Sequence, residues 1–211
     1  MSGSGGNHDL WVLRHGATEW SQNGRHTGRT DVALTDRGRR QAEGLARVLD
    51  GRPFARVLVS PLTRARETCA LAGYGDQAEV DEDLREWDYG DYEGITTEEI
   101  RRSQPGWTVW SAPCPGGETI TQVAARADRV IARARAAGGD VALFAHGHIL
   151  RMVTARWCRL EPVEGRCFPL DTGTVNILGW EHESPAILRW NDPALEPACE
   201  PAAGRDQVSG K

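Results

Sequence analysis

The sequence has no apolar run that approaches the ~18 residues needed to cross a membrane. Its first ten residues, MSGSGGNHDL, have neither the basic nor the apolar segment of a secretory signal. Its five cysteines are scattered and odd in number, and they do not have the paired spacing of a metal site. These absences predict a reduced chain in the cytoplasm, without a membrane partner.

An excess of positive charge is also missing. The chain has 25 Lys and Arg against 30 Asp and Glu, so its formal net charge is -5, and Lys211 is its only lysine. Overall electrostatics therefore do not favour binding to nucleic acid, and any anionic ligand must be met by a local group of arginines. The length of 211 residues and the hydrophobic content of 39% are typical of one domain with a proper core.

Short apolar runs alternate with longer amphipathic segments along the chain. The pattern predicts strands over residues 10–13, 55–60, 140–146, 174–180 and 186–190, and helices over residues 35–50, 61–72, 118–137 and 148–158. Thr35 is the expected N-cap of the first helix, and Pro61 suits the first position of the second. This order favours an α/β fold, a three-layer α/β/α sandwich with a mostly parallel sheet and one antiparallel edge strand.

One folded domain is expected over residues 8–192, with flexible ends at residues 1–7 and 193–211, which are rich in Gly, Pro, Ala and Ser. Residues of about 87–117 read as an insertion that caps one end of the sheet. Trp107 and Trp110 lie in this insertion, where they can either form a wall for a substrate or pack the cap itself.

Three predicted strands end in the same kinds of residue. The first runs into Arg14, His15 and Gly16, the second into a helix with Arg64, and the third into "HGH", residues 146–148. A single histidine at such a place is most often a packing residue, but ligands of parallel sheets bind beyond the carboxyl ends of the strands. If the three strands are neighbours, these side chains converge on one pocket.

Such a pocket has the chemistry of a phosphate site. Two arginines with forked donors, together with a protonated histidine, can balance the charge of roughly -1.5 to -2 on a phosphate monoester without a metal. His15 can also attack phosphorus, provided that the ring is neutral and that a backbone carbonyl holds the other ring nitrogen as a donor. Gly16 allows the backbone to turn closely enough for such a bond.

The segments LRHGATEW, TGRTDVALTDRGRRQAE, VSPLTRARETC, LREWDYGDYEG and FAHGHILR resemble, in order and spacing, the motifs of the histidine phosphatase superfamily, also called phosphoglycerate mutase-like. The resemblance covers roughly residues 10–190. It implies that His15 forms a phosphohistidine and that Glu86 is the proton donor. The residues expected to bind phosphate are Arg14, Arg64, His146 and Gly147, and those expected on the substrate side are Ser21, Thr27, Gly28 and Tyr89. Arg101, in the cap insertion, is expected on the substrate side as an arginine that can hold a second anionic group, against the alternative of an ordinary exposed residue. Ser21 stands where many members carry an asparagine that contacts phosphate.

The resemblance leaves the choice of enzyme open. A short segment after Glu86, without the cation-rich insertion of the mutases, favours a phosphatase for small phosphate esters such as sugar phosphates, close to the acid phosphatase and sedoheptulose-bisphosphatase branches. The alternatives are a cofactor-dependent phosphoglycerate mutase and a non-catalytic module that binds a phosphorylated ligand. "HGH" has no third ligand placed to complete a metal site, so no metal and no cofactor are expected. We expect a monomer or a homodimer.

Overall fold

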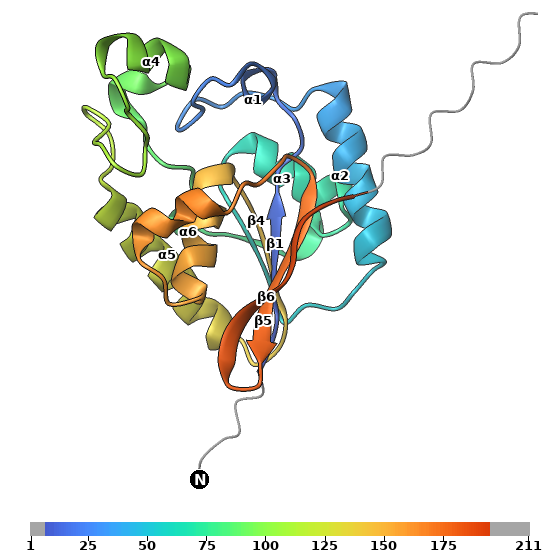
Figure 1. Cartoon of the computed structure of the whole chain (residues 1–211). Helices are drawn as coiled ribbons and strands as arrows, with labels where there is room; N and C mark the ends of the chain where they lie inside the picture. The colour runs from blue at the N-terminus through green and yellow to red at the C-terminus, as the bar shows by residue number, and fades with distance from the viewer. Residues whose placement is uncertain (1–6, 195–211) are drawn as a thin grey trace, which may run out of the picture.

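The computed structural model describes residues 7–194, and six strands form its single sheet (Figure 1). The strand order is β3-β2-β4-β1-β5-β6. The strands are β1 (Leu10–Arg14), β2 (Arg56–Val59), β3 (Ala78–Val80), β4 (Val141–Ala145), β5 (Thr174–Glu181) and β6 (Ser184–Pro193). The pairs β1–β4, β2–β4 and β2–β3 are parallel, whereas β5 is antiparallel to both β1 and β6. The predicted fold class is therefore confirmed, and the antiparallel part is the pair β5–β6 at one edge.

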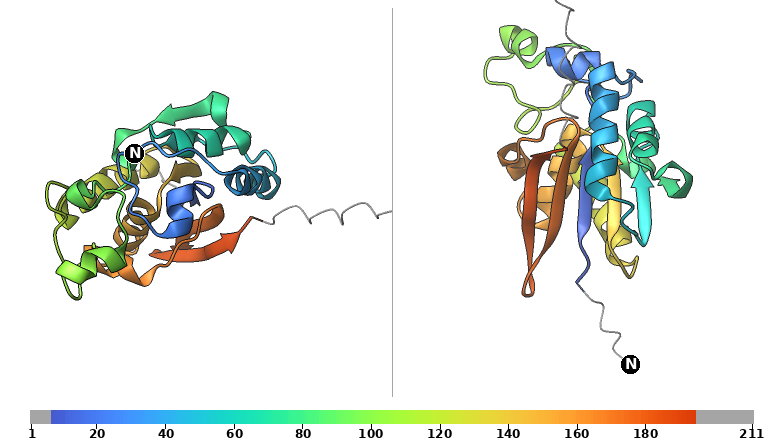
Figure 2. Two further views of the ribbon diagram at one scale, coloured as in Figure 1. Left: turned by 90° about the horizontal axis from the view of Figure 1, so that it is seen from above. Right: turned by 90° about the vertical axis from the view of Figure 1, so that its right-hand side faces the viewer.

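Helices cover both faces of the sheet (Figure 2). The elements are α1 (Glu19–Asn23), α2 (Asp36–Leu49), α3 (Thr63–Leu71), α4 (Thr97–Ser103), α5 (Ile120–Arg135) and α6 (Gly147–Trp157). Successive residues of β1 face opposite sides: Leu10 and Val12 pack with α5 and α6, and Trp11 and Leu13 pack with α2 and α3. This double burial explains why the parallel strands read as continuous apolar runs.

The predicted helix starts were partly right. Thr35 caps α2, since its hydroxyl accepts the N–H of Gly38 at 3.1 Å. Pro61 is not the first residue of α3, which begins two residues later at Thr63. The reason is that the chain stays extended through Leu62, and the backbone N–H of Thr63 donates instead to the Asp31 carboxylate at 2.9 Å.

Residues 87–117 leave the sheet at its upper end in Figure 1, where α4 stands apart from the layered body. The two ends of this segment meet through main-chain hydrogen bonds, from the N–H of Asp91 to the carbonyl of Pro115 at 2.8 Å and from the N–H of Glu118 to the carbonyl of Asp88 at 2.9 Å. A Cβ on Gly90, whose φ is +53°, would lie 2.1 Å from the Pro115 oxygen. The base of the cap is therefore closed by backbone contacts that need glycine.

The expected flexible ends lie almost wholly outside the described residues. The exceptions are Asn7, Pro193 and Ala194, and these make defined contacts. Asn7 donates to the carbonyl of His182, Pro193 is paired within β6, and Ala194 is buried in the core on the α2 side. Within residues 7–194 no helix is both long enough and apolar enough to cross a membrane.

Candidate active site

The topology brings the carboxyl ends of β1, β2 and β4 together at one end of the sheet. Strand β4 lies between β1 and β2, and the N–H of His15 donates to the carbonyl of Ala145 at 3.0 Å, where β1 and β4 end side by side. The rings of His15 and His146 are 5.1 Å apart, and Arg64 reaches His146 from the first turn of α3. The strand-end residues thus form one cluster, as the parallel order requires.

The ring of His15 is held in a defined protonation state. Its Nδ1 lies 2.7 Å from the carbonyl oxygen of Gly16, which can only accept, so Nδ1 carries the proton and the lone pair is on Nε2. Burial lowers the pKa of His15 well below its usual value, and the charges of Arg64 and Arg14 add to this effect. His15 is therefore a neutral imidazole with one free nitrogen, which is the form that can act as a nucleophile.

The turn after His15 depends on two glycines that face each other. A Cβ on Gly16 would lie 2.1 Å from the carbonyl oxygen of Gly38 in α2, and a Cβ on Gly38 would lie 2.1 Å from that of Ala17. The N–H of Gly16 donates to the hydroxyl of Thr68 at 3.1 Å. The turn that follows His15 therefore packs closely against α2, and this packing fixes the Gly16 carbonyl that orients His15.

Arg14 has a buried donor without a partner. One terminal nitrogen of its guanidinium donates to the carbonyl of Leu170, but Nε has no hydrogen-bond partner among the described residues. Burial lowers the pKa of Arg14, and the nearby charge of Glu86 opposes that effect. A buried donor left unpaired costs roughly 1–3 kcal/mol. An anion bound between His15 and Gly147 would remove this cost.

Arg64 is fully buried and is held by the protein on several sides. Its Nε donates to Nδ1 of His146 at 3.1 Å, and its terminal nitrogens donate to the carbonyls of Thr27 and Gly28, both at 3.1 Å, and of Thr30 at 2.9 Å. The second ring nitrogen of His146, Nε2, lies 2.7 Å from the hydroxyl of Ser60. The backbone at residues 27–28 thus contributes carbonyls that hold Arg64.

Glu86 lies at the N-terminus of α6. Its Oε1 accepts the N–H groups of Trp87 and Ile149, both at 2.9 Å, and its Oε2 accepts the N–H of His148 at 2.9 Å. The first turn of a helix offers N–H groups without intrahelical partners and a favourable dipole, which explains this position. Because Oε1 accepts two bonds and Oε2 only one, Oε2 is the oxygen with room to carry a proton.

The pocket above these groups has a volume of about 180 Å³. It is lined by Arg14, His15, Ser21, Gly24, Arg25, His26, Thr27, Glu86, Tyr89, Gly147, His148, Arg151 and Leu170. Arg64 and His146 lie beneath this lining rather than in it.

Besides Arg64 and His146, three residues predicted on the substrate side are used differently from the prediction. Arg101 is not in the lining, because its guanidinium donates to the carbonyl of Trp107 at 2.8 Å and stays on the cap. Gly28 is also absent from the lining, and its N–H donates to the carboxylate of Glu93. Ser21 lines the pocket, but its hydroxyl donates to the carbonyl of Thr18 at 2.9 Å as part of a helix cap.

The cap tryptophans stand behind the pocket wall. Trp107 is 5.4 Å from the ring of His26, and Trp110 is 5.4 Å from the ring of His148. Both tryptophans are buried, and neither is in the lining. Of the two interpretations from the sequence, packing of the cap is therefore the one the structure supports.

Several lining residues were missed by the sequence analysis. His148 was expected only to begin a helix, but its Nδ1 lies 2.6 Å from the hydroxyl of Tyr89. Arg151 lies over the ring of Trp110 at 4.9 Å and donates to the carbonyl of Gly165 at 3.1 Å. Its spacing of four residues from Gly147 places both on one side of α6, and this signal could have revealed it.

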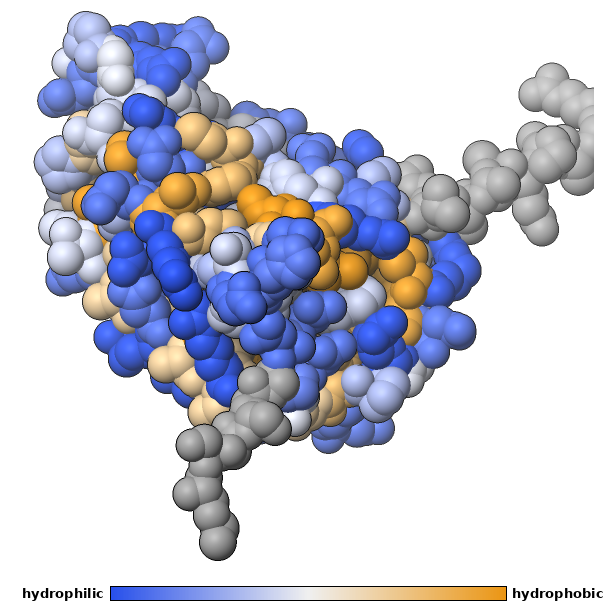
Figure 3. Space-filling view, turned by 60° about the horizontal axis from the view of Figure 1, so that its bottom comes forward, coloured by the Kyte–Doolittle hydropathy of each residue, from blue (hydrophilic) through white to orange (hydrophobic). Residues whose placement is uncertain are grey.

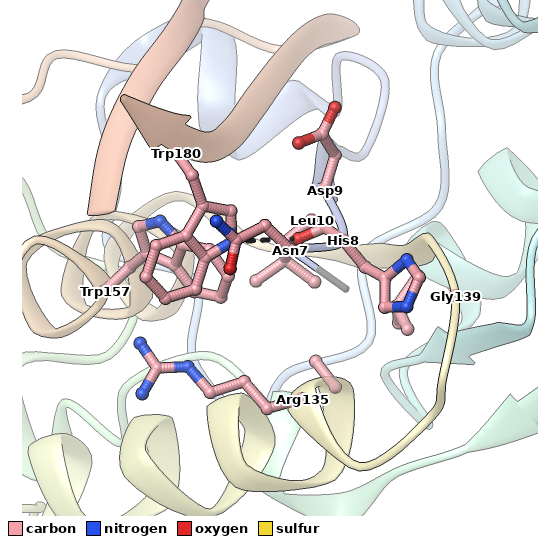
Figure 4. A pocket seen from close by; sticks show the side chains of 10 residues that line it. Asn7, His8, Asp9, Leu10, Arg135, Gly139, Trp157 and Trp180 are labelled. Atoms are coloured by element: carbon pink, nitrogen blue, oxygen red, sulfur yellow. Dashed lines mark hydrogen bonds between the residues drawn. The ribbon is translucent and has the colours of Figure 1, made fainter. Parts of the chain in front are cut away.

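A second cavity, of about 240 Å³, lies at the opposite end of the sheet, where β1 and β4 begin. With that end turned forward, the surface shows apolar residues in a band across the view, between hydrophilic residues (Figure 3). In this cavity the guanidinium of Arg135 lies 4.9 Å from the ring of Trp157 and 5.5 Å from that of Trp180 (Figure 4). Cation–π contacts account for this arginine, and the cavity lies far from the strand-end cluster.

Comparison with known proteins agrees with this geometry. A sequence profile of the histidine phosphatase superfamily (branch 1) matches residues 10–193. The chain belongs to this superfamily. An acid phosphatase from Mycobacterium tuberculosis is 46% identical over 180 residues, covering 83% of this chain and 88% of that protein. A sedoheptulose 1,7-bisphosphatase from Saccharomyces cerevisiae is 33% identical, covering 88% of this chain and 90% of that protein.

The histidine phosphatase fold is confirmed by solved structures. The structure of an open reading frame product from Mycobacterium tuberculosis superimposes with a TM-score of 0.86 at 42% sequence identity. The match covers 90% of this chain and all of that chain. The resemblance that the motifs indicated is therefore confirmed at the level of family and fold.

Proposed function

We propose that this histidine phosphatase is a metal-independent phosphomonoesterase that hydrolyses small phosphorylated metabolites, such as sugar phosphates, through a phosphohistidine on His15. One observation carries the proposal: a neutral His15, with Nδ1 fixed as a donor, stands beside the unpaired, buried Nε of Arg14. An oxygen of a phosphoryl group between them would accept a hydrogen bond from the Nε–H of Arg14, and the phosphorus would face the free lone pair of His15 Nε2. Relatives named as phosphatases support this interpretation.

The reaction has two steps. Nε2 of His15 attacks phosphorus, a P–N bond forms, and the P–O bond to the substrate alcohol breaks. Glu86 gives the departing alkoxide a proton, for which Oε2 is the available oxygen. Water then attacks phosphorus, Glu86 takes the proton of that water, and the P–N bond breaks to release phosphate and neutral His15. Arg14 and Arg64 supply the positive charge, with His146 and Gly147 beside them.

Water is the proposed acceptor, rather than the second phosphorylated acid that a mutase requires. Of residues 87–117, only Tyr89 lines the pocket, so the cap contributes no cation to clamp an acceptor carboxylate. Arg25 and Arg151 line the pocket from elsewhere, and each also donates to backbone carbonyls. The alternative functions are those of a mutase and of a non-catalytic binding module. The cytoplasmic location and the monomeric or homodimeric state remain predictions.

Phosphoenzyme trapping tests the proposal. Wild-type protein, mixed with a labelled aryl phosphate in the presence of a chelator, should release phosphate and give a label that is acid-labile and alkali-stable, as phosphohistidine is. His15→Ala should give neither, while keeping the circular dichroism spectrum of the wild type. Arg101→Gln is a matched control, because Arg101 lies outside the lining of the pocket. This variant should hydrolyse the substrate at the wild-type rate. An acid-stable label, or activity that requires a divalent ion, would contradict the proposal.

A further inference from the structure

Ser60 touches the active site without lining it. It follows strand β2, is fully buried, and its N–H donates to the carbonyl of Phe144 at 3.0 Å. Its hydroxyl oxygen lies 2.7 Å from Nε2 of His146. Since Ser60 is absent from the pocket lining, any effect that it has on the reaction is indirect, and His146 is its side-chain partner.

The hydrogen-bond directions around His146 follow from the donor groups. The Nε of Arg64 can only donate, so Nδ1 of His146 accepts this bond and carries no proton. The single proton of the neutral ring is then on Nε2, and it is donated to the hydroxyl of Ser60. The same hydroxyl oxygen accepts the N–H of Leu62 at 3.4 Å, so both of its lone pairs are used.

A protonated His146 does not fit this arrangement. Its Nδ1–H would point at the N–H of Arg64, and the bond between the two side chains would be lost. The groups that act on the charge of His146 are Arg64, His15, Arg14 and Arg126. Burial, together with these groups, lowers the pKa of His146 well below its usual value, which agrees with the neutral ring that the geometry requires.

We propose that Ser60 is a positioning residue that holds His146 as the neutral Nε2–H tautomer, and that this tautomer in turn fixes the guanidinium of Arg64 beneath the pocket. The inference rests on the proposed function for the role of Arg64. His146 therefore acts on the phosphoryl group through Arg64 at least as much as by direct contact, because both of its ring nitrogens are engaged with the protein.

Nitrogen NMR of the histidine rings tests the tautomer directly. Wild-type protein should show His146, assigned by its loss in His146→Gln, as the neutral Nε2–H form. In Ser60→Ala the Nε2 proton has no acceptor, so the ring should show a changed tautomer ratio or an altered Nε2 shift. Ser60→Thr, which keeps the hydroxyl, should restore the wild-type pattern. An Nδ1–H form in the wild type, or an unchanged ring in Ser60→Ala, would overturn the proposal.

Kinetics provide the second readout. Ser60→Ala should raise KM for an aryl phosphate, and the inhibition constant of inorganic phosphate, on the order of tenfold, since the loss of one buried hydrogen bond is expected to have an effect of that size. The acid limb of its kcat/KM profile should also move. Thr154→Val is the matched control, because it removes a buried hydroxyl that donates only to Leu150 within α6. If Ser60→Ala and Thr154→Val changed KM and the pH dependence of kcat/KM equally, the positioning role of Ser60 would be contradicted.

The two proposals fail in different ways. If His15→Ala kept its turnover, the phosphohistidine mechanism would fall, whereas the NMR result on His146 does not depend on turnover. If wild type formed the phosphoenzyme but Ser60→Ala bound phosphate like wild type, only the role of Ser60 would be wrong.

Discussion

Replacing Glu86 by Gln tests the proton donor, and the structure sets the size of the expected effects. The carboxylate accepts three backbone N–H bonds, two at Oε1 and one at Oε2. A glutamine that keeps its oxygen toward Trp87 and Ile149 must turn its NH₂ group toward the N–H of His148, so one charge-assisted bond becomes a contact between two donors. Such a bond contributes about 1.5–3 kcal/mol. For a domain of this size, that loss lowers Tm by roughly 3–12 °C.

The effect on catalysis should depend on the leaving group. A general acid contributes about 10²–10⁴-fold when the leaving group needs a proton. Glu86→Gln should therefore slow the hydrolysis of a sugar phosphate by a factor in that range, and slow phosphoenzyme formation from 4-nitrophenyl phosphate far less, because a nitrophenolate leaves without help. Stopped-flow release of nitrophenolate measures phosphoenzyme formation, and steady-state release of phosphate measures hydrolysis of the sugar phosphate. Glu99→Gln is the control, because the Glu99 carboxylate accepts the backbone N–H of Thr96, the N-cap of α4, but lies outside the pocket. An equal loss with both substrates would refute the acid role.

Three further predictions follow from the same contacts. Arg64→Lys should reduce kcat/KM severely, because an ammonium cannot reproduce the planar contacts to His146 and to the carbonyls of Thr27, Gly28 and Thr30. Near-normal kinetics would make Arg64 dispensable. Gly38→Ala should lower the free energy of unfolding, measured by chemical denaturation, by about 1–3 kcal/mol, because the new Cβ would meet the carbonyl of Ala17. Alanine usually favours a helix, so a stabilised variant would contradict this reasoning. Burial lowers the pKa of His26 to about 4, so the unfolded chain binds this proton first as pH falls. His26 should therefore contribute up to about 3 kcal/mol to a loss of stability between about pH 6.5 and 4, and His26→Gln should show a shallower slope by that amount.

The sheet and the main helices were predictable because their signals are local. The parallel strands are buried on both faces and are therefore continuous apolar runs, and Thr35 is a residue type that commonly caps a helix. The convergence of Arg14, Arg64 and His146 needed only one further rule, that ligands bind beyond strand ends. These parts of the fold and of the site therefore followed from the residue pattern.

The rest depends on tertiary contacts that a local pattern does not contain. Nothing in the sequence around Arg101 indicates that its guanidinium folds back on Trp107 instead of entering the pocket. The start of α3 at Thr63 depends on Asp31, which is distant in the chain. The role of Ser60 could not be inferred either, because it depends on which nitrogen of His146 faces Arg64, and that is a matter of ring orientation.

The closed base of the cap has a consequence for how new substrate preferences can arise. Because residues 88–91 and 115–118 are joined by main-chain hydrogen bonds, both ends of the cap stay fixed when α4 between them changes in length or sequence. His15 and Arg64 are anchored by elements on the other side of that junction. Insertions and grafts in α4, which stands apart from the layered body, are thus the place where an engineer, or natural variation, can alter the cap while Glu93 still holds Gly28 and the phosphoryl-transfer groups keep their geometry.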